Sequence, residues 1–129
     1  MQFTIAAIAA LITLTTALPT ESKRAGAGVT FYVLENFNNT GAHDHEVYDY
    51  NTCHNVPVAL YGNVGSVAVD PGAYCRITYT ADECTLHGDA FVYPPGETNL
   101  HQFKDPASGN VVDAGKLITS FLCQECTSC

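Results

Sequence analysis

The amino-acid sequence predicts an all-β domain, an antiparallel sandwich or barrel of short strands. Two observations support this fold class. β-branched and aromatic residues are concentrated in short alternating runs, and Gly, Pro, Asn or Asp bounds these runs at roughly 8–15-residue intervals. After residue 25 the chain has almost none of the apolar spacing that an amphipathic helix needs. An all-β fold therefore follows from pattern alone.

The expected strands follow from these runs in chain order. Each run is followed within three residues by Gly, Pro, Asn or Asp, which favour turns. The run SVAV, for example, ends directly at Asp-Pro-Gly. The expected strands are residues 29–34, 46–50, 58–61, 66–69, 74–79, 90–93 and 110–112, with a further strand-like run at 116–122.

One half of the chain repeats the other. Three positions recur 47 positions later: Tyr32, Phe37 and Gly41 become Tyr79, Cys84 and Gly88. The Val-Asp-x-Gly sequence at 69–72 recurs at 112–115, and a strand-like run follows each copy. The repeat predicts two Greek keys plus a terminal strand.

These residues also carry a family resemblance. FYVLENF at 31–37, followed by Gly41, resembles the folded-hairpin signature of the βγ-crystallins, in which two aromatic residues with four residues between them precede a glycine. Residues 66–79 are similar to the stretch that joins two motifs in that family. Here the glycine follows the second aromatic by four residues rather than the usual two, and Cys84 replaces the aromatic in the second copy.

The resemblance implies a disulfide-stapled, βγ-crystallin-like Greek-key β-sandwich. The two aromatics would pack across the hairpin, and the glycine would allow a backbone conformation that a Cβ obstructs. Another disulfide-tied β-sandwich is the alternative, and small secreted fungal effector-like or killer-toxin-like chains have a similar layout. The expected core comprises Tyr32, Phe37, Val67, Val69, Ile77 and Tyr79.

The beginning of the chain predicts export. Residues 1–17 are apolar and Thr-rich and end in Thr-Thr-Ala, which indicates a signal peptide too short to span a membrane. Residues 18–24 form a short pro-segment ending in Lys23 and Arg24, which resemble a kexin-type processing site. The mature protein would then consist of a two-motif Greek-key domain, residues 25–122, and a Cys-rich tail, residues 123–129. We expect it to be secreted, extracellular and monomeric.

The composition of the mature part limits the classes of molecule that it is expected to bind. Removing residues 1–24 leaves 105 residues, with three basic side chains against twelve acidic ones and a formal charge of −9. This charge disfavours binding to nucleic acid or to an anionic membrane surface. Asn38 begins an Asn-x-Thr acceptor sequence for N-glycosylation.

The cysteines predict three disulfides, because an even number in a small exported chain reads as a disulfide framework. Fifteen pairings are formally possible. We favour Cys75–Cys84 across a hairpin, one tail cysteine bonded to Cys53, and the other two tail cysteines joined. In an oxidising compartment, disulfides are expected over the metal or iron–sulfur binding that a Cys-x-x-Cys-x-x-Cys tail would otherwise suggest. The six residues are Cys53, Cys75, Cys84, Cys123, Cys126 and Cys129.

Two segments are weak metal candidates. Residues 61–66 and 104–109 would correspond to the calcium loops of microbial βγ-crystallins, but only Asp105 and Ser108 remain as ligands in the second, beside a lysine. Calcium needs six to eight oxygens, so we expect no calcium site and no cofactor. His43 and His45 would share one face of an extended segment while Asp44 points away, and no third ligand is specified, so a polar hairpin loop is preferred to a metal site.

No catalytic motif is present: the sequence lacks a nucleophile elbow, a zinc-protease helix and a phosphate-binding glycine loop. The acids Asp82, Glu83 and Asp89 read as surface charges rather than as a glycosidase pair.

The leading hypothesis is a secreted, non-enzymatic protein that binds an extracellular protein or glycan of a host or competitor, as a fungal effector, elicitor or toxin. Its expected binding loops are 43–46, 62–65 and 93–98. They include His43, Asp44, His45, Glu46 and Glu97. The alternatives are a protease inhibitor, with 62–65 or 94–98 as its inhibitory loop, and a calcium-stabilised structural protein of wall or spore.

Overall fold

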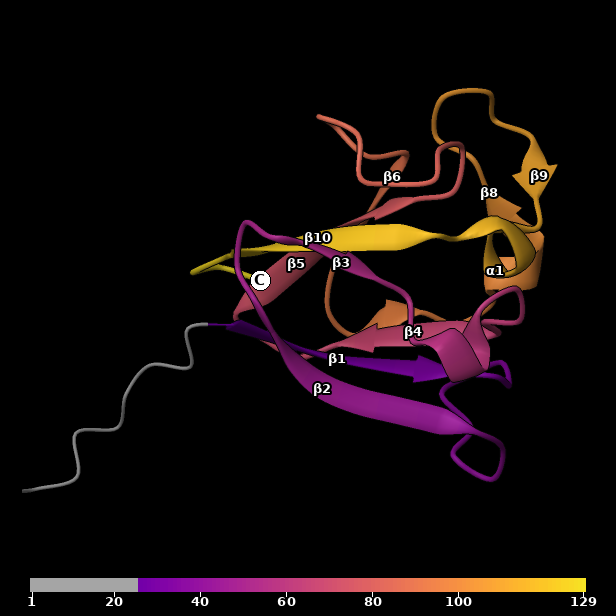
Figure 1. Ribbon diagram of the computed structural model, residues 1–129, viewed down its shortest axis with the longest axis horizontal. Helices are drawn as coiled ribbons and strands as arrows, with labels where there is room; N and C mark the ends of the chain where they lie inside the picture. The colour runs from indigo at the N-terminus through magenta and orange to yellow at the C-terminus, as the bar shows by residue number, and fades with distance from the viewer. Residues whose placement is uncertain (1–25) are drawn as a thin grey trace, which may run out of the picture.

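A computed structural model describes residues 26–129 (Figure 1). The expected signal peptide, the pro-segment and the Lys23–Arg24 processing site lie outside the described residues. The described part is built almost entirely of antiparallel strands in two facing sheets, with a two-stranded ribbon beside a short helix at one end. The predicted all-β class is therefore confirmed.

Each of the two main sheets has four strands, and their outer faces point in opposite directions (Figure 1). The first sheet has the order β2(His43–Asp49), β1(Gly26–Tyr32), β4(Ser66–Val69), β7(Gly96–Glu97). The second has the order β3(Cys53–Asn55), β10(Ser120–Glu125), β5(Ala73–Thr78), β6(Ala90–Val92). The ribbon pairs β8(Phe103–Lys104) with β9(Val111–Val112), and the short helices are η1(Val58–Leu60), η2(Leu100–Gln102) and α1(Ala114–Leu117).

The strand orders reveal two interlocked Greek keys. Strands β1 to β4 form the first motif, and β5, β6, β7 and β10 form the second. Each motif gives its third strand to the other sheet, because β7 pairs with β4 and β3 pairs with β10. When each strand is numbered by its position within its own motif, the first sheet has the order 2-1-4-3. The second sheet, taken from β6 to β3, has the same order. The 47-position repeat is confirmed at its start, since β1 begins at Gly26 and β5 at Ala73.

Three local predictions were wrong. Residues 58–61 form the 3₁₀ turn η1 after Pro57 rather than a strand, and Val58 is 93% exposed there. Residues 116–122 begin in helix α1, capped by the Asp113 carboxylate, so 112–115 is not the structural counterpart of the turn at 69–72. The expected boundary between 122 and 123 falls inside β10. Side-chain pattern alone does not distinguish a short apolar turn from a short buried strand.

The core lies between the two sheets and is centred on aromatic rings. The Phe31 ring of β1 lies 5.0 Å from the Phe121 ring of β10, and Tyr48 of β2 packs edge-on against Phe121 at 4.7 Å. The expected burial of Val67, Val69, Ile77 and Tyr79 is confirmed.

Tyr32 and Phe37, however, are only partly buried. Phe31 is fully buried on the inner side of β1. Successive side chains of a strand point to opposite faces, so Tyr32 must point to the outer face of the first sheet.

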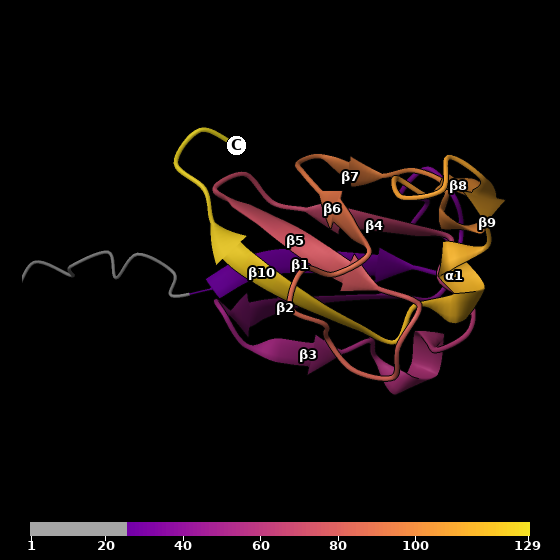
Figure 2. The same cartoon turned by 90° about the horizontal axis from the view of Figure 1, so that it is seen from above.

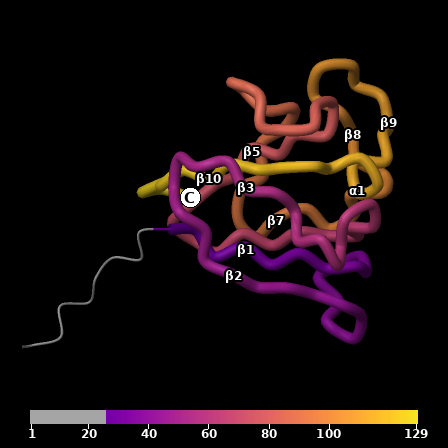
Figure 3. The backbone as a smooth tube through the Cα atoms, in the orientation of Figure 1, coloured from indigo at the N-terminus to yellow at the C-terminus, as the bar shows by residue number. Residues whose placement is uncertain are grey.

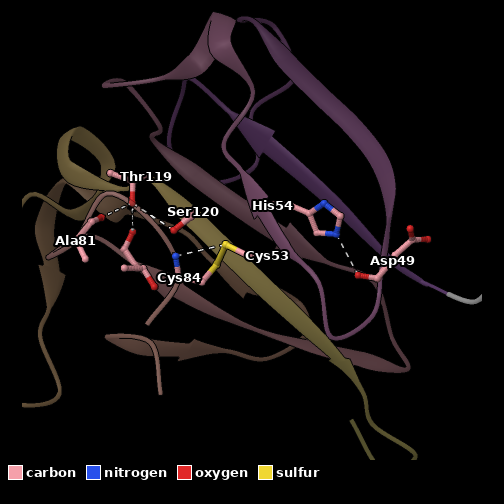
Figure 4. Close-up of a disulfide and its surroundings, with 8 residues drawn as sticks. Asp49, Cys53, His54, Ala81, Cys84, Thr119 and Ser120 are labelled. Atoms are coloured by element: carbon pink, nitrogen blue, oxygen red, sulfur yellow. Dashed lines mark hydrogen bonds between the residues drawn. A yellow bond between two sulfur atoms is a disulfide. The ribbon is translucent and has the colours of Figure 1, made fainter. Parts of the chain in front are cut away.

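Three disulfides stabilise the sandwich, as predicted, but two of the three favoured cysteine pairings were wrong. The bonds are Cys53–Cys84, Cys75–Cys123 and Cys126–Cys129, so only the joining of two tail cysteines is confirmed. Cys75 and Cys123 are directly opposite each other on β5 and β10 and both face the core. Figure 4 shows Cys53, at the start of β3, bonded to Cys84 in the loop after β5.

The loop that carries Cys84 is fixed in place beside this bond. The Cys84 N–H donates to Cys53 Sγ at 3.3 Å, and Thr119 Oγ1 donates to the Ala81 carbonyl at 2.6 Å (Figure 4). The tail is anchored separately, because the Cys126 N–H donates to the Gly72 carbonyl and the Gly72 N–H donates to the Cys129 carbonyl. The C-terminus lies at the same end of the sandwich as the start of β1 (Figure 3).

Candidate functional site

The predicted loop 43–46 is part of strand β2, the outer edge of the first sheet. His43 pairs with Tyr32 and His45 with Thr30, so both imidazoles lie on the outer face of the sheet. Asp44 and Glu46 pair with the inward-facing Phe31 and Val29 and lie on the other face of β2. The structure thus splits this predicted cluster into two histidines and two acids on opposite faces.

The outer face of the first sheet carries a groove of about 440 Å³, which we call the first-sheet groove. Aromatic rings, prolines and small apolar side chains make most of its lining, and one carboxylate lies at its edge. The lining residues are Tyr32, Phe37, Ala68, Val69, Asp70, Pro71, Pro94 and Pro95.

The Phe37 ring in this groove is held by a strained backbone. Asn36 and Phe37 have φ angles of 58° and 55°, the left-handed region that bulky residues rarely adopt. Tertiary hydrogen bonds fix this conformation: Asn36 N–H donates to the Thr98 carbonyl at 2.8 Å, and Phe37 N–H donates to Ser66 Oγ at 3.1 Å. Backbone strain of this kind persists only where surrounding contacts enforce it, and it is concentrated at functional sites.

Ser66 connects the two halves of this arrangement. Its side chain is fully buried, accepts from Phe37 N–H and donates to the Leu34 carbonyl at 2.6 Å. The Phe37 ring then lies 5.9 Å from the Tyr32 ring, so the expected aromatic packing across the hairpin is present. The aromatic side of the groove is thereby set before any ligand arrives.

Asp70 is placed at the groove by close packing over a glycine. A Cβ at Gly28 would lie 2.1 Å from Asp70 Oδ2, so only glycine leaves room for the carboxylate there. His45 Nε2 lies 3.9 Å from the same oxygen, and both side chains are about half exposed. On its other side, His45 Nδ1 lies 3.2 Å from Thr30 Oγ1.

The two histidines do not converge on one point. The His43 ring stacks on Tyr32 with centroids 5.8 Å apart, and its Nδ1 contacts the Gly41 carbonyl at 3.0 Å. His45 instead faces Asp70. Within residues 26–129, no three His, Cys, Asp or Glu side chains are grouped so as to hold a metal ion.

Glu97 lies far from the histidines, at the opposite edge of the same sheet on β7. It is partly buried, and burial raises the pKa of its carboxyl. It lines a more polar depression of about 420 Å³ with Phe91, Gln102 and Lys104. The structure therefore does not join Glu97 and the 43–46 segment into one surface loop cluster.

Asp44 and Glu46 affect the pKa of Tyr48, a buried tyrosine on the same strand. Burial, and after it the charges of Glu46 and Asp44, together raise the pKa of the Tyr48 hydroxyl to about 12.

The weak calcium candidates are used inside the β8–β9 hairpin. The Asp105 carboxylate accepts hydrogen bonds from Tyr79 Oη, from Ser108 N–H at 2.9 Å and from Ser108 Oγ at 2.7 Å. The bond from Tyr79 and then those from Ser108 lower the pKa of Asp105. Because its oxygens already accept three donors and Lys104 is adjacent, this segment does not fit a calcium ion, which needs six to eight oxygen ligands.

The second predicted loop, 62–65, is half inside the molecule. Val64 is 0% exposed, and a Cβ at Gly65 would lie 2.5 Å from the backbone of Val33 and Leu34. This segment was wrongly expected to be an exposed loop, and it has no room to present an inhibitory sequence to a protease.

Asn38 of the glycosylation sequence lies on an exposed turn. Its Oδ1 accepts from Thr40 N–H at 3.0 Å and from Thr40 Oγ1 at 2.8 Å. The side chain is therefore accessible from solvent, and its modification stays a prediction.

Sequence reasoning missed Asp70 as a residue of this groove, and it placed Pro94 and Pro95 in the expected binding loop 93–98 without joining them to Tyr32 and Phe37. Asp70 reads as a turn residue in Val-Asp-Pro-Gly, and the two prolines read as a break after a strand. The one available signal was the pair of glycines in the first strand, Gly26 and Gly28, since glycine inside a strand marks close approach of another group.

No helix among residues 26–129 is long and apolar enough to cross a membrane.

Comparison with known proteins supports the fold and nothing finer. No protein-family model matches this chain, and none of the curated proteins matches it. Among solved structures it is similar to a βγ-crystallin domain of Abundant Perithecial Protein from Neurospora crassa, determined in the Ca²⁺-bound form. The two share 20% identity with a TM-score of 0.50 over 78% of this chain and 90% of that one. The predicted βγ-crystallin-like Greek-key sandwich is therefore confirmed.

Proposed function

We propose that this chain is a secreted, non-enzymatic protein that binds an extracellular target of another organism, as a fungal effector, elicitor or toxin does. The observation that carries the proposal is the first-sheet groove, with its apolar lining and the single carboxylate of Asp70. A predicted export signal and three disulfides support an extracellular site of action. The form that acts would begin at Ala25, after processing at Lys23 and Arg24.

The chemistry of the groove favours a partner surface with an apolar side chain beside a basic one. Tyr32 and Phe37 offer aromatic area to the apolar group, and Asp70 offers a half-exposed carboxylate to the cation. The formal charge of −9 for residues 25–129 would steer a basic partner toward this protein and make association weaken as salt rises.

A preset groove suits recognition because it lowers the cost of binding. The Asn36–Phe37 backbone is held by Thr98 and Ser66 before contact, so little side-chain or loop ordering remains to be done. Ordering an interfacial side chain costs about 0.5–1.5 kcal/mol, and this cost is avoided when the group is already fixed.

The non-enzymatic part of the proposal rests on how the polar groups are used. Asp89 accepts from the Tyr79 and Thr80 N–H groups, and His101 Nδ1 pairs with Asp113 Oδ1 at 2.7 Å beside the cap of α1. These contacts fasten loops. They leave those groups in structural roles rather than facing a shared reaction centre.

The experiment compares partner capture by the secreted protein and its groove variants. Phe37→Ala and Asp70→Asn should each weaken binding to a captured host extracellular protein at least tenfold. Glu83→Gln removes an exposed acid from the loop after β5 and should leave binding unchanged. Equal binding by all three variants, or turnover of a peptide or polysaccharide by the wild type, would overturn the proposal.

A second candidate is a calcium-stabilised structural protein of wall or spore. It is favoured by the structural neighbour, which was determined in the Ca²⁺-bound form. A melting temperature that rises with calcium would support this role, and one that is indifferent to calcium would reject it.

A further inference from the structure

The outer face of the second sheet carries an aromatic cluster that the first-sheet groove does not use. The Tyr74 ring of β5 lies 6.0 Å from the Phe91 ring of β6 and 5.5 Å from the Tyr93 ring, which follows β6. Phe91 and Tyr93 lie 6.3 Å apart and stack with their planes 29° from parallel. They are 49% and 54% exposed, so this three-ring cluster, the aromatic platform, is open to solvent.

Planar polar side chains continue the platform across the sheet. Gln124 of β10 lies opposite Tyr74, and its Oε1 accepts from Tyr74 Oη and from Arg76 Nη2, the latter at 2.7 Å. Gln124 Nε2 in turn donates to Asn51 Oδ1 at 3.0 Å. This chain of bonds holds an amide, a guanidinium and a hydroxyl at fixed positions beside the rings.

The strand positions on this face are poor in charge. Strand alternation assigns nine residues to the outer side of the sheet, and Arg76 is the one that carries a formal charge. The Arg76 guanidinium is held in place by two bonds, since Nη1 donates to the Leu86 carbonyl at 2.8 Å and Nη2 donates to Gln124, while its buried Nε has no partner. The nine residues are Cys53, Asn55, Tyr74, Arg76, Thr78, Phe91, Ser120, Leu122 and Gln124.

A charge-poor face on a protein with a formal charge of −9 selects for an uncharged ligand. An anion would be repelled by the protein as a whole. A cation would find no carboxylate on the strands of this face, and Glu97, in the depression that Phe91 also lines, is accompanied there by Lys104. What the face does offer is aromatic area with amide, hydroxyl and guanidinium groups at its border. A ligand that fits must have an apolar surface and a rim of hydroxyl groups.

We propose that the aromatic platform binds a neutral polysaccharide chain. The C–H face of a pyranose ring would pack on Phe91 and Tyr93, and its equatorial hydroxyls would accept hydrogen bonds from the second Nε2 hydrogen of Gln124 and from the side-chain amide of Asn51. The strands of this sheet run side by side (Figure 2), and because the loop that carries Cys84 and Leu86 buries Thr78 and Ser120, the ligand would lie over the open end with Tyr74 and Gln124. This site faces away from the first-sheet groove and goes beyond the function proposed above.

The size of the platform also favours a glycan over a protein partner. Three partly exposed rings offer on the order of 300 Å² of aromatic surface, given about 150–250 Å² for each whole side chain. A stable protein interface needs roughly 800 Å² per partner. A polysaccharide can bind through a few rings because each sugar unit is small and flat.

The test is depletion of the secreted protein from solution by insoluble chitin, cellulose and β-1,3-glucan, each measured separately. We expect at least one of the three to retain the wild-type protein. Phe91→Ala with Tyr93→Ala should weaken that retention at least tenfold. Val111→Ala, which trims an exposed apolar side chain on β9, is the matched control and should bind like the wild type. Retention should also be insensitive to NaCl between about 0.1 and 0.5 M, because a neutral ligand is not screened.

Further variants separate this site from the first-sheet groove. Phe37→Ala should keep full polysaccharide retention even where it loses a protein partner. Tyr93→Ala alone serves if the double variant unfolds, since this ring is more than half exposed. Failure of all three polysaccharides, retention that is unchanged in folded platform variants, or retention that falls with salt would overturn the proposal. So would loss of a protein partner, rather than of a polysaccharide, on Tyr93→Ala.

Discussion

The disulfides should differ sharply in how much they stabilise the fold. Replacing Cys75 and Cys123 together by alanine removes a bridge that closes a sequence separation of 48, whereas the Cys126–Cys129 bridge closes a separation of 3. The chain-entropy relation gives about 4 kcal/mol for the first and about 2 kcal/mol for the second. Cys75 and Cys123 are also buried in the core, so their removal leaves a cavity that adds to the loss.

The double variant Cys75→Ala/Cys123→Ala should therefore lose at least about 2 kcal/mol more than Cys126→Ala/Cys129→Ala, or about 10 °C in Tm for a domain of this size. Thermal melts and urea unfolding of the two variants and the wild type measure this difference. Graded reduction followed by thiol labelling adds a second readout, in which Cys126 and Cys129 should be labelled first. Equal loss of stability in both variants, or earlier labelling of Cys75 and Cys123, would refute the reasoning.

Three further predictions follow from single contacts. Ser66→Ala leaves Phe37 N–H without its acceptor and should destabilise the fold by about 1–3 kcal/mol in urea unfolding, while the exposed Ser128→Ala should not. The folded state lowers the pKa of Asp105, so its ionised form adds stability above the ordinary carboxyl pKa of about 4, and this stability is lost as pH falls through the lower folded pKa. Asp105→Asn should flatten that acid limb of the stability-pH curve, and an unchanged limb would count against the Tyr79 and Ser108 bonds as its cause. Calorimetry at millimolar calcium should show no saturable heat, because the Asp105 carboxylate already accepts three hydrogen bonds; micromolar binding would contradict this reading.

The sequence alone determined the class of the fold and its internal repeat. Alternation of β-branched and aromatic residues is a local property, since it follows from side chains pointing to opposite faces of one strand. It therefore predicted most of the strands that form, including the whole of β4. The repeat predicted two motifs, and the even number of cysteines predicted that all six are bonded.

Local pattern also misled where a residue's surroundings decide its state. Residues 43–46 are polar enough to read as a loop, yet they pair along β1 as an edge strand, where exposed polar side chains are tolerated. Val64 and Gly65 lie among glycines that suggest an exposed loop, but the backbone of Val33 and Leu34 covers them. Tyr32 was expected in the core because it is aromatic, although Phe31 occupies the inward position.

Only the tertiary structure decided which strands and which cysteines are partners. Alternation specifies the face on which a side chain lies but not the neighbouring strand. The alternation therefore could not predict that β3 and β7 each pair with a strand of the other motif. That exchange and the pairing of β5 with β10 place Cys53 near Cys84 and Cys75 opposite Cys123. The first-sheet groove likewise draws Tyr32, Phe37, Asp70 and Pro94 from separate segments. Such a site exists only after long-range packing, because no residue in it selects its distant neighbours by local chemistry.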